Sequence, residues 1–343
     1  MLRAKKSTIN DVARLAGVSK KTVSRVINKS TLVRKETYEK VEKVIAELKY
    51  SPDPQARGLS FRRSFLFGLV YDNVNASFIA DVQQGVLDTS RNEGYELVVH
   101  PCDNKSEGKI DELQQLIDRL KLAGVILLPP MSEDEGLIKM LNSIECHYVR
   151  ILSAPLDAPS NMVYSNDRDA MHHVASHLVD LGHREIGFIH GPKSSLAARE
   201  RYAGFAEALA TRHVKLPRRN VAWGDHSFAS GLSAAQKLLA NKSRPTAIFA
   251  SNDEMALGTI VAATRWGIQI PEQLSIVGFD DEPHAAEIHP SLTTINQNLK
   301  QKGQLAAAKL VALCNKQPEQ AAAIESKLDL SLIARESTTR VPL

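Results

Sequence analysis

The chain has 343 residues, of which 43% are hydrophobic and 24% are charged, enough for one small and one large folded unit. The first residues contain no apolar leader, and no later run approaches the ~18–20 apolar residues that span a bilayer. We therefore expect a cytoplasmic protein with no membrane partner.

Charge is distributed unevenly along the chain. Residues 1–63 carry 16 Lys and Arg against 6 Asp and Glu, a net charge of +10, whereas the other 280 residues carry 27 against 33, a net charge of −6. A basic segment joined to a nearly balanced one is typical of a nucleic-acid-binding unit attached to an ordinary globular unit.

Residues 8–28 predict two short helices joined by a tight turn. Apolar residues recur at i, i+3, i+4 and i+7 from Ile9, which predicts the first helix over 9–15. Gly17 tolerates a positive φ in the turn, and Ser19 is placed to cap the second helix. A third helix over 35–48 would complete a small core.

The second helix predicts a DNA-reading surface. Its valines point inward and its outer face is basic and rich in hydrogen-bonding groups. A solvated basic helix is the alternative. The spacing favours DNA, because Arg25 lies where a guanidinium can span O6 and N7 of guanine, and Lys20 and Lys21 lie where a major groove receives a helix N-terminus.

A linker follows over 51–63. Pro52 ends the preceding helix, and Pro54 is placed to open a very short helix over 55–59. A helix of this length cannot offset its own nucleation cost, so we expect it to need a partner.

From about residue 64, short apolar runs alternate with amphipathic helices, which predicts parallel sheets covered on both faces. The second half repeats the pattern of the first, so we expect two doubly wound lobes. The expected strands are 65–71, 95–100, 124–128, 148–152, 185–189, 221–224, 247–250 and 275–278, and the expected helices are 77–92, 108–122, one between 128 and 148, 172–181, 199–210, 230–239 and 254–266.

Polar residues follow several of these strands, where ligands of such sheets bind. Asp72, Asn252 and Asp280 are examples. Their carboxylate and amide groups suit the hydroxyls of a small polyhydroxylated ligand. The alternative is structural: Asn252 could cap the helix over 254–266, and Asp280 could cap a turn before Pro283.

Two sequence strings make the chain resemble the LacI/GalR family of bacterial transcriptional repressors. They are D-V-A-x-x-A-G-V-S-x-x-T-V-S-R-V-x-N over 11–28 and Y-x-P-x-x-x-A-R-x-L over 50–59. Further matches are L-G-H-R-x-I over 181–186, R-Y-A-G-F over 201–205, S-N-D-E-M-A-L-G over 251–258, G-F-D-D over 278–281 and L-T-T-I over 292–295. The resemblance covers nearly the whole chain.

The resemblance implies an N-terminal all-α helix-turn-helix head and an α/β body of two doubly wound parallel-sheet lobes, similar to periplasmic binding proteins. We expect the head over 1–50, a hinge-helix linker over 51–63 and an effector-binding and dimerisation body over 64–343. The N-lobe would comprise about 64–163 and 296–324, and the C-lobe about 164–295 and 325–337.

The resemblance also assigns residues to two sites. In this family the linker forms a hinge helix only on operator DNA, where its leucine, here Leu59, wedges between base steps in the minor groove. The DNA-binding candidates are Thr8, Ile9, Ser19, Lys20, Lys21, Thr22, Ser24, Arg25, Asn28, Tyr50, Ala56 and Leu59. The effector-binding candidates are Arg201, Asn252, Asp280 and Gln297, with Asp72, Phe78, Pro129, Asp167, His226 and Phe228 lining the same cleft.

The expected function is therefore a repressor that binds double-stranded operator DNA as a homodimer and responds to a small effector, with a sugar favoured. An enzyme with a two-lobed cleft and a secreted sugar-binding protein are the alternatives. No nucleotide-binding, nucleophile-elbow or zinc-protease motif supports an enzyme, and a secreted protein would not carry a basic head.

We expect no cofactor and no metal. Cys102, Cys146 and Cys314 are scattered singly, without a C-x-x-C pair or a histidine at metal-ligand spacing, and we interpret them as reduced packing residues.

Overall fold

The computed structural model describes residues 7–27, 32–48, 50, 64–72 and 75–341. These residues belong to two compact units, one ending at Phe65 and the other beginning at Leu66. The expected linker helix over 55–59 lies outside the described residues. Within the described ranges, no helix combines the length and apolar character needed to cross a membrane.

The part of the first unit, the head, that the structure describes contains three helices: α1 (Ile9–Ala16), α2 (Lys20–Ile27) and α3 (Lys35–Glu47). Ser19 caps α2 as predicted, because its Oγ accepts a hydrogen bond from the amide of Thr22 at 3.1 Å. The three helices share one apolar core, composed of Val12, Ala13, Ala16, Val23, Val26 and Val41.

The turn between α1 and α2 depends on Gly17. This residue has φ +63° and ψ 35°, and its amide closes the end of α1 by donating to the carbonyl of Arg14. Such a left-handed conformation is strained for any residue with a Cβ. A Cβ at this position would approach only Nζ of Lys40, at 3.7 Å, so the constraint is conformational and not steric.

The N-lobe of the second unit is built on a parallel sheet of six strands in the order β11-β5-β4-β3-β1-β2. The strands are β1 (Leu66–Tyr71), β2 (Glu96–Pro101), β3 (Gly124–Leu127), β4 (His147–Leu152), β5 (Met162–Ser165) and β11 (Lys327–Leu328). Its helices are α5 (Ala76–Ser90), α6 (Lys109–Leu120), α7 (Glu135–Ser143), α13 (Leu299–Cys314) and α14 (Pro318–Ala323).

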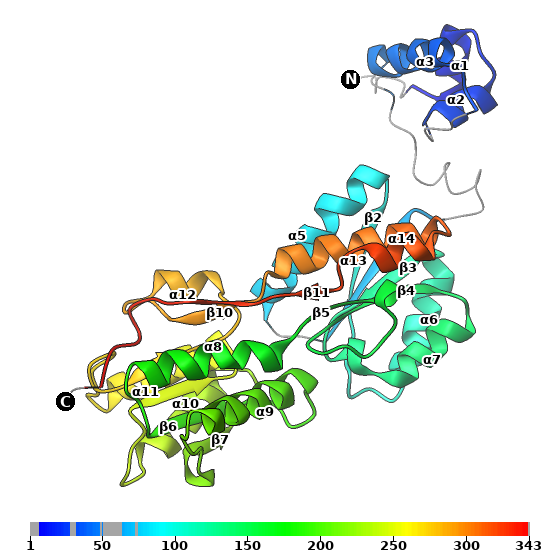
Figure 1. Ribbon diagram of the computed structural model, residues 1–343. Coiled ribbons are helices and arrows are strands. Elements are labelled where there is room, and N and C mark those ends of the chain that lie inside the picture. The colour runs from blue at the N-terminus through cyan, green and yellow to red at the C-terminus, as the bar shows by residue number, and fades with distance from the viewer. Residues whose placement is uncertain (1–6, 28–31, 49, 51–63, 73–74, 342–343) are drawn as a thin grey trace, which may run out of the picture. The chain divides into compact units, whose positions relative to one another are not determined.

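Helices cover both faces of this sheet. The side chains of α6 and α7 pack with Val125 and Leu127, whereas α5 and α13 run side by side over the other face (Figure 1). Glycines allow the close approach of α5 and α13, because a Cβ on Gly85 would lie 1.9 Å from the carbonyl oxygen of Lys300, and one on Gly303 would lie 2.3 Å from that of Val82.

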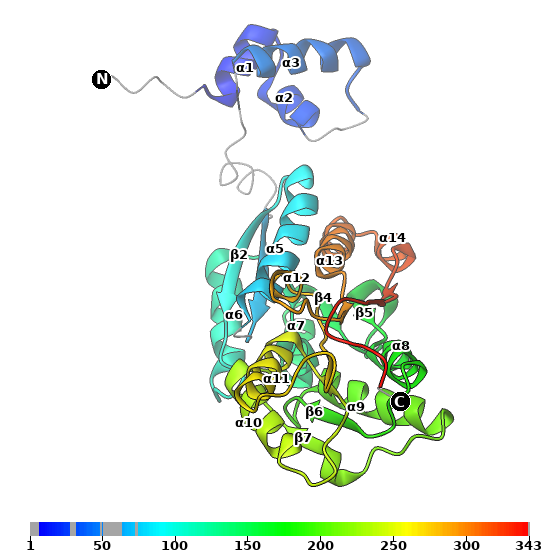
Figure 2. The ribbon, with the colours of Figure 1, turned by 90° about the vertical axis from the view of Figure 1, so that its left-hand side faces the viewer.

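The C-lobe repeats this plan on a smaller parallel sheet in the order β7-β6-β8-β9. The pairs α8–α9 and α10–α11 cover its opposite faces (Figure 2). The strands are β6 (Ile186–His190), β7 (Val221–Trp223), β8 (Ala247–Ala250) and β9 (Ser275–Val277), and the helices are α8 (Asp167–Asp180), α9 (Leu196–Thr211), α10 (Phe228–Leu239), α11 (Asp253–Arg265) and α12 (Pro283–Glu287).

The chain passes between the lobes three times. It leaves the N-lobe sheet after β5, returns after β10 (Thr294–Asn296) into α13, and leaves again after β11 toward β12 (Ser331–Ile333), which pairs antiparallel with β10. Three crossing segments therefore hold the two lobes together. The carboxyl ends of the parallel strands in each lobe face the other lobe.

The expected strands and helices up to residue 278 are present, with shifted ends. The helix expected over 172–181 is α8, which starts earlier, at Asp167. The prediction missed this start because the first residues of α8 are polar and show no apolar period. The expected lobe boundaries fall inside the N-lobe sheet, since β5 runs to Ser165 and β11 pairs with it. The structure also contains β5, α12, α13, α14 and β10–β12, which were not predicted as separate elements.

Replacing Gly17 with alanine should destabilise the head by about 1–2 kcal/mol, the usual cost of a left-handed conformation for an L-residue. Hydrogen exchange of head amides in the full-length G17A variant measures this loss. Gly267, at φ +68° in the C-lobe with no atom near its Cβ position, is the matched control. G267A should accelerate exchange in the C-lobe and leave the head unchanged; equal exchange in the heads of G17A and the wild type would contradict the prediction.

Candidate functional site

A cavity of about 590 Å³ lies between the lobes, where the carboxyl ends of both sheets meet. This edge is where open α/β sheets bind ligands. Phe228 does not contribute to the lining; it begins α10 and is 37% exposed. The other predicted effector-binding residues line the cavity: Asp72, Phe78, Pro129, Asp167, Arg201, His226, Asn252, Asp280 and Gln297.

Six buried side chains beside the cavity form a closed circuit of polar contacts, which we call the charge ring. Arg201 Nε donates to Asp167 Oδ2 at 2.8 Å, and Ser165 Oγ donates to Asp167 Oδ1 at 2.7 Å. Lys302 Nζ donates to Ser165 Oγ at 2.8 Å and to Gln297 Oε1 at 2.6 Å. Gln297 Nε2 donates to Asp280 Oδ1 at 2.5 Å, and that oxygen lies 4.0 Å from Arg201 Nη1, which closes the ring.

The charge ring contains two cations and two carboxylates, so its charges balance. Balance is required because an isolated buried charge is costly to desolvate. Burial lowers the pKa of Lys302 to about 8, although the nearby Asp167 and Asp280 oppose that change. Burial likewise raises the pKa of Asp280 to about 6, and Arg201 and Gln297 act against it. The ionisation of Lys302 and of Asp280 therefore depends on the neighbouring charges of the ring.

Arg201 is fixed by more than its ion pair. Its Nη1 donates to the backbone carbonyl of Ser251 at 2.5 Å, and its guanidinium carbon lies 3.5 Å from the ring centroid of Phe279. Stacking on an aromatic face and a fork of hydrogen bonds together restrict the guanidinium to one orientation. The ring therefore presents its polar atoms in fixed positions.

Three buried polar atoms of lining residues have no hydrogen-bond partner among the described residues: Glu133 Oε1, Ser153 Oγ and His226 Nε2. Burial, together with the charge of Arg201, lowers the pKa of His226 to about 3, so its imidazole is neutral. Gly191 leaves room for that imidazole, because a Cβ there would lie 2.1 Å from Nε2. Buried groups of this kind are normally satisfied, and a ligand in the cavity would supply the missing partners.

The structural alternative is correct for Asn252. Its Oδ1 accepts from the amide of Met255 at 3.0 Å and caps α11, while its Nδ2 donates to the carbonyl of His226 at 2.9 Å. Asp280 differs, because its carboxylate bonds to Gln297 and the cap position of α12 is occupied by Glu282. Asn252 therefore positions a neighbour in the cavity wall, whereas Asp280 belongs to the charge ring.

Sequence reasoning missed Asn75, Glu133, Ser165 and Lys302, which also line the cavity. Lys302 is the instructive case. It lies in a helix whose sequence, L-K-Q-K-G-Q, is that of a solvated surface, yet its side chain is 2% exposed. The local sequence does not predict this burial, because one of the two hydrogen-bond partners of Lys302, Ser165, is 137 residues away.

The head carries the predicted DNA-contacting residues that the structure describes. Lys20, Lys21 and Arg25 are exposed on α2. Thr8 donates to Asp11 Oδ2 through its amide and its hydroxyl, at 3.0 and 2.7 Å. Ser19 Oγ, besides capping α2, lies 2.9 Å from Thr22 Oγ1.

Ile9 and Tyr50 pack against the head core, so both contribute to its stability. Thr22 and Ser24 are half-buried on α2. Asn28, Ala56 and Leu59 lie outside the described residues, and their assignment stays a prediction.

Comparison with known proteins identifies both units. Residues 8–53 match bacterial regulatory proteins of the lacI family, and residues 175–338 match a periplasmic binding protein-like domain. The chain is 33% identical to the HTH-type transcriptional repressor PurR of Pectobacterium carotovorum, over 98% of each chain. It is 29% identical to the probable HTH-type transcriptional repressor ExuR of Bacillus subtilis, over 91% of this chain and 92% of the relative.

Solved structures give the same result. A lac repressor dimer bound to operator and the anti-inducer ONPF is 29% identical, with a TM-score of 0.75 over 98% of this chain and all of the other. A complex of the transcriptional regulator CelR with cellobiose is 29% identical, with a TM-score of 0.72 over 96% and 99% of the two chains. The predicted fold class and the predicted regulator, as opposed to an enzyme, are confirmed: the chain belongs to the LacI family of bacterial regulatory proteins and is a helix-turn-helix transcriptional repressor.

Proposed function

We propose that this repressor binds a palindromic operator as a homodimer and that a small polyhydroxylated metabolite, a sugar or a close relative of one, controls it from the cavity between the lobes. The charge ring and the unpartnered polar atoms beside it are the observation that carries this proposal. Carboxylates, amides and a guanidinium in fixed positions suit vicinal hydroxyls, whereas an apolar ligand would leave those polar groups unsatisfied.

The relatives support this class of effector. CelR is solved with cellobiose, and the lac repressor with an anti-inducer. Phe78 at one wall of the cavity supplies an apolar surface for the face of a pyranose ring. Because one head reads only half of a palindrome, a two-fold dimer is needed to read the whole site. A protein that acts on the chromosome works in the cytoplasm.

Besides the charge ring, contacts of Glu133 and Asn75 join the lobes across the cavity, and they are the parts that a ligand would strengthen or break. Glu133 Oε2 of the N-lobe accepts from the amide of Leu196 at 3.0 Å, at the start of α9 in the C-lobe. Asn75 Nδ2 of the N-lobe donates to Glu282 Oε1 of the C-lobe. A ligand that binds one lobe arrangement better than the other shifts the population toward it, and that shift is the signal the head receives.

DNA reading is tested with an operator selected from a random-sequence pool. Arg25→Ala should cost about 1–3 kcal/mol and relax discrimination at one position of each half-site, because a base-edge contact is lost. Lys35→Ala, at the exposed start of α3, should weaken all sequences about equally, since a lysine at a phosphate carries no sequence information. If both variants lose affinity equally for all operator sequences, Arg25 contacts only a phosphate.

Effector binding is tested by screening hexoses, disaccharides including cellobiose, and purines for thermal stabilisation of the full chain. For the sugar that stabilises it, Arg201→Lys should weaken binding by at least tenfold, about 1.4 kcal/mol, because an ammonium cannot reproduce the fork of the guanidinium. Arg199→Lys, on the exposed side of the same helix, is the control and should bind normally.

Operator affinity without sugar should be the same in both variants, which separates a lost ligand contact from a misfolded body. Stabilisation by purines alone would overturn the sugar assignment while leaving the cavity as the site. Normal sugar binding by a folded R201K variant would remove the charge ring from effector recognition.

The burial of Glu282 predicts a pH-dependent stability. Burial and the nearby Asp280 raise the pKa of Glu282 to about 8, from an ordinary value of 4.5. Between these two pH values the folded chain holds a proton that the unfolded chain has released, so this group makes stability fall as pH rises. Glu282→Gln, which imitates the protonated form and can still accept from Asn75, should lose this dependence.

Urea unfolding at several pH values measures the effect. Relative to E282Q, the free energy of unfolding of the wild type should decline from pH about 4.5 to about 8. Glu287→Gln, an exposed residue on α12, is the matched control and should follow the wild type at every pH. Parallel pH profiles for E282Q and the wild type would show that Glu282 is ionised throughout this range.

A further inference from the structure

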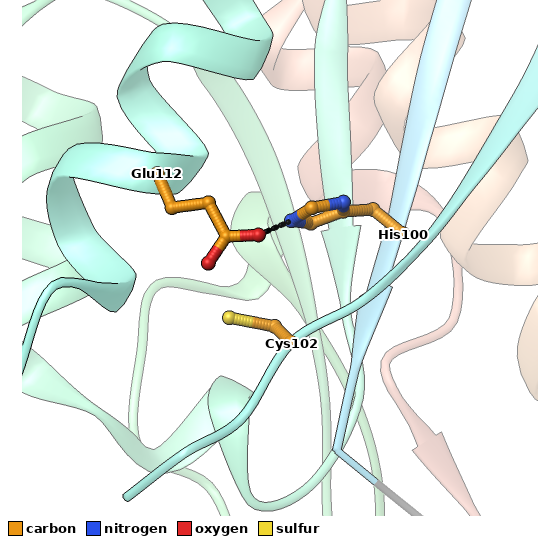
Figure 3. A group of neighbouring side chains, drawn as sticks. All are labelled: His100, Cys102 and Glu112. Atoms are coloured by element: carbon orange, nitrogen blue, oxygen red, sulfur yellow. Dashed lines mark ion pairs between the residues drawn. The ribbon is translucent and has the colours of Figure 1, made fainter. Parts of the chain in front are cut away.

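Three side chains of metal-binding type converge at the end of β2, in a group separate from the cavity lining. They are His100, Cys102 and Glu112, and Figure 3 shows them pointing toward one another. One ligand atom of each lies within 4.8 Å of one ligand atom of each of the others. His100 Nε2 and Glu112 Oε1 are 3.4 Å apart.

The fold brings this group together by simple geometry. His100 and Cys102 are two residues apart at the end of a strand, so both side chains emerge on the same face of the sheet. The strand pairing extends to Cys102, whose amide donates to the carbonyl of Tyr71 at 2.8 Å. Glu112 comes from α6, which packs on that same face.

The connection between β2 and α6 is held in place. Lys109 Nζ donates to the backbone and side-chain oxygens of Asn104, both at 2.8 Å, and lies 2.6 Å from Asp134 Oδ2. The amide of Asn104 in turn donates to Asp72 Oδ2 at 3.0 Å. The strand end and the helix therefore cannot separate freely, and the three side chains are preorganised.

His100 Nε2 is buried and unsatisfied. It lies 3.4 Å from Glu112 Oε1, but it makes no hydrogen bond to that oxygen or to any other atom of the described residues. A buried polar atom without a partner requires an explanation. A metal ion held between the imidazole, the thiolate and the carboxylate would provide one.

We propose that His100, Cys102 and Glu112 form a binding site for a divalent transition-metal ion of the Zn²⁺ or Co²⁺ type. The separation of His100 Nε2 and Glu112 Oε1 is close to the distance between two ligand atoms of one tetrahedral zinc ion, about 3.3 Å for bonds of ~2.0 Å. The thiol sulfur completes three of the four positions, and the fourth is open to water because the Glu112 side chain is 54% exposed.

The donor set selects the metal. One sulfur and one imidazole nitrogen suit zinc and its neighbours, whereas magnesium and calcium prefer oxygen ligands alone. Binding replaces the thiol proton of Cys102 with the metal ion, and that proton passes to the solvent. The product is a neutralised cluster that ties β2 to α6.

Cys102 is a free thiol buried in the N-lobe core, as the sequence predicted, and the proposed site would give it a second role. The spacing His-x-Cys is visible in the sequence, but its significance depends on two features that the sequence does not show. One is that His100 lies in β2 and Cys102 directly follows it, where the pairing with β1 continues, so that the two side chains share a face. The other is that Glu112, ten residues later, is turned back onto that face by α6.

Cobalt titration of the metal-free full-length protein tests the proposal. The wild type should bind one Co²⁺ per chain with a thiolate-to-cobalt charge-transfer band and tetrahedral d–d absorption, and Zn²⁺ should displace it. Cys102→Ser should lose the charge-transfer band. Glu112→Gln, at an exposed position that tolerates substitution, should keep the band and bind Zn²⁺ at least tenfold more weakly.

Cys146→Ser is the matched control, because Cys146 also has a neighbouring histidine, His147, but no place in the group. Glu107→Gln, an exposed acid just before α6, is the control for Glu112. Both should bind like the wild type. Zn²⁺ should raise the melting temperature of the wild type and of both controls, and not that of C102S.

Absence of the charge-transfer band in the wild type would overturn the site. A band that persists in C102S and disappears in C146S would also overturn it. Equal zinc affinity of E112Q and E107Q would exclude Glu112 as a ligand. If C102S fails to fold, the comparison of E112Q with E107Q still decides the proposal.

Discussion

The ion pair between Arg201 and Asp167 is the interaction on which the cavity depends. Neither residue is more than 5% exposed, and a single buried charge of either sign would carry a desolvation cost of several kcal/mol. The pair is tolerated because each partner has further contacts: Asp167 accepts from Ser165, and Arg201 lies against Phe279 and a backbone carbonyl. The other members of the charge ring are linked to this pair. Lys302 is linked to Asp167 through Ser165, and Gln297 is bonded to Asp280, which lies 4.0 Å from Arg201.

A ring of balanced charges makes the cavity polar without making it strongly charged. Such a cavity rewards a ligand that can exchange hydrogen bonds with fixed groups, and it discriminates against one that cannot. The strong charge of the molecule is placed elsewhere, in the basic N-terminal segment. Nucleic-acid attraction and ligand recognition are thereby separated along the chain.

How far the sequence could predict this molecule depends on the range of each interaction. Local signals succeeded: the cap by Ser19, the turn at Gly17 and the alternation of strands and helices are set by neighbouring residues. Asn252 was correctly recognised as a possible cap for the same reason. Contacts between distant segments could not be predicted, and Lys302 and Ser165, 137 residues apart, are the clearest example. The group of His100, Cys102 and Glu112 could not be predicted from the sequence, because it forms only when α6 packs on the face of the sheet from which His100 and Cys102 emerge.

Four members of the charge ring lie where the chain crosses between the lobes. Ser165 and Asp167 stand where the first crossing leaves β5, and Gln297 and Lys302 stand where the second enters α13. Atoms close to a pivot move little when two bodies rotate about it, so these four side chains would shift less than the rest of the cavity wall if the angle between the lobes changed. Asn75 and Glu133 belong to no crossing, so their contacts with the opposite lobe would be the first to change with that angle. The cavity therefore combines side chains anchored where the chain crosses between the lobes with two contacts that depend on how closely the lobes approach each other.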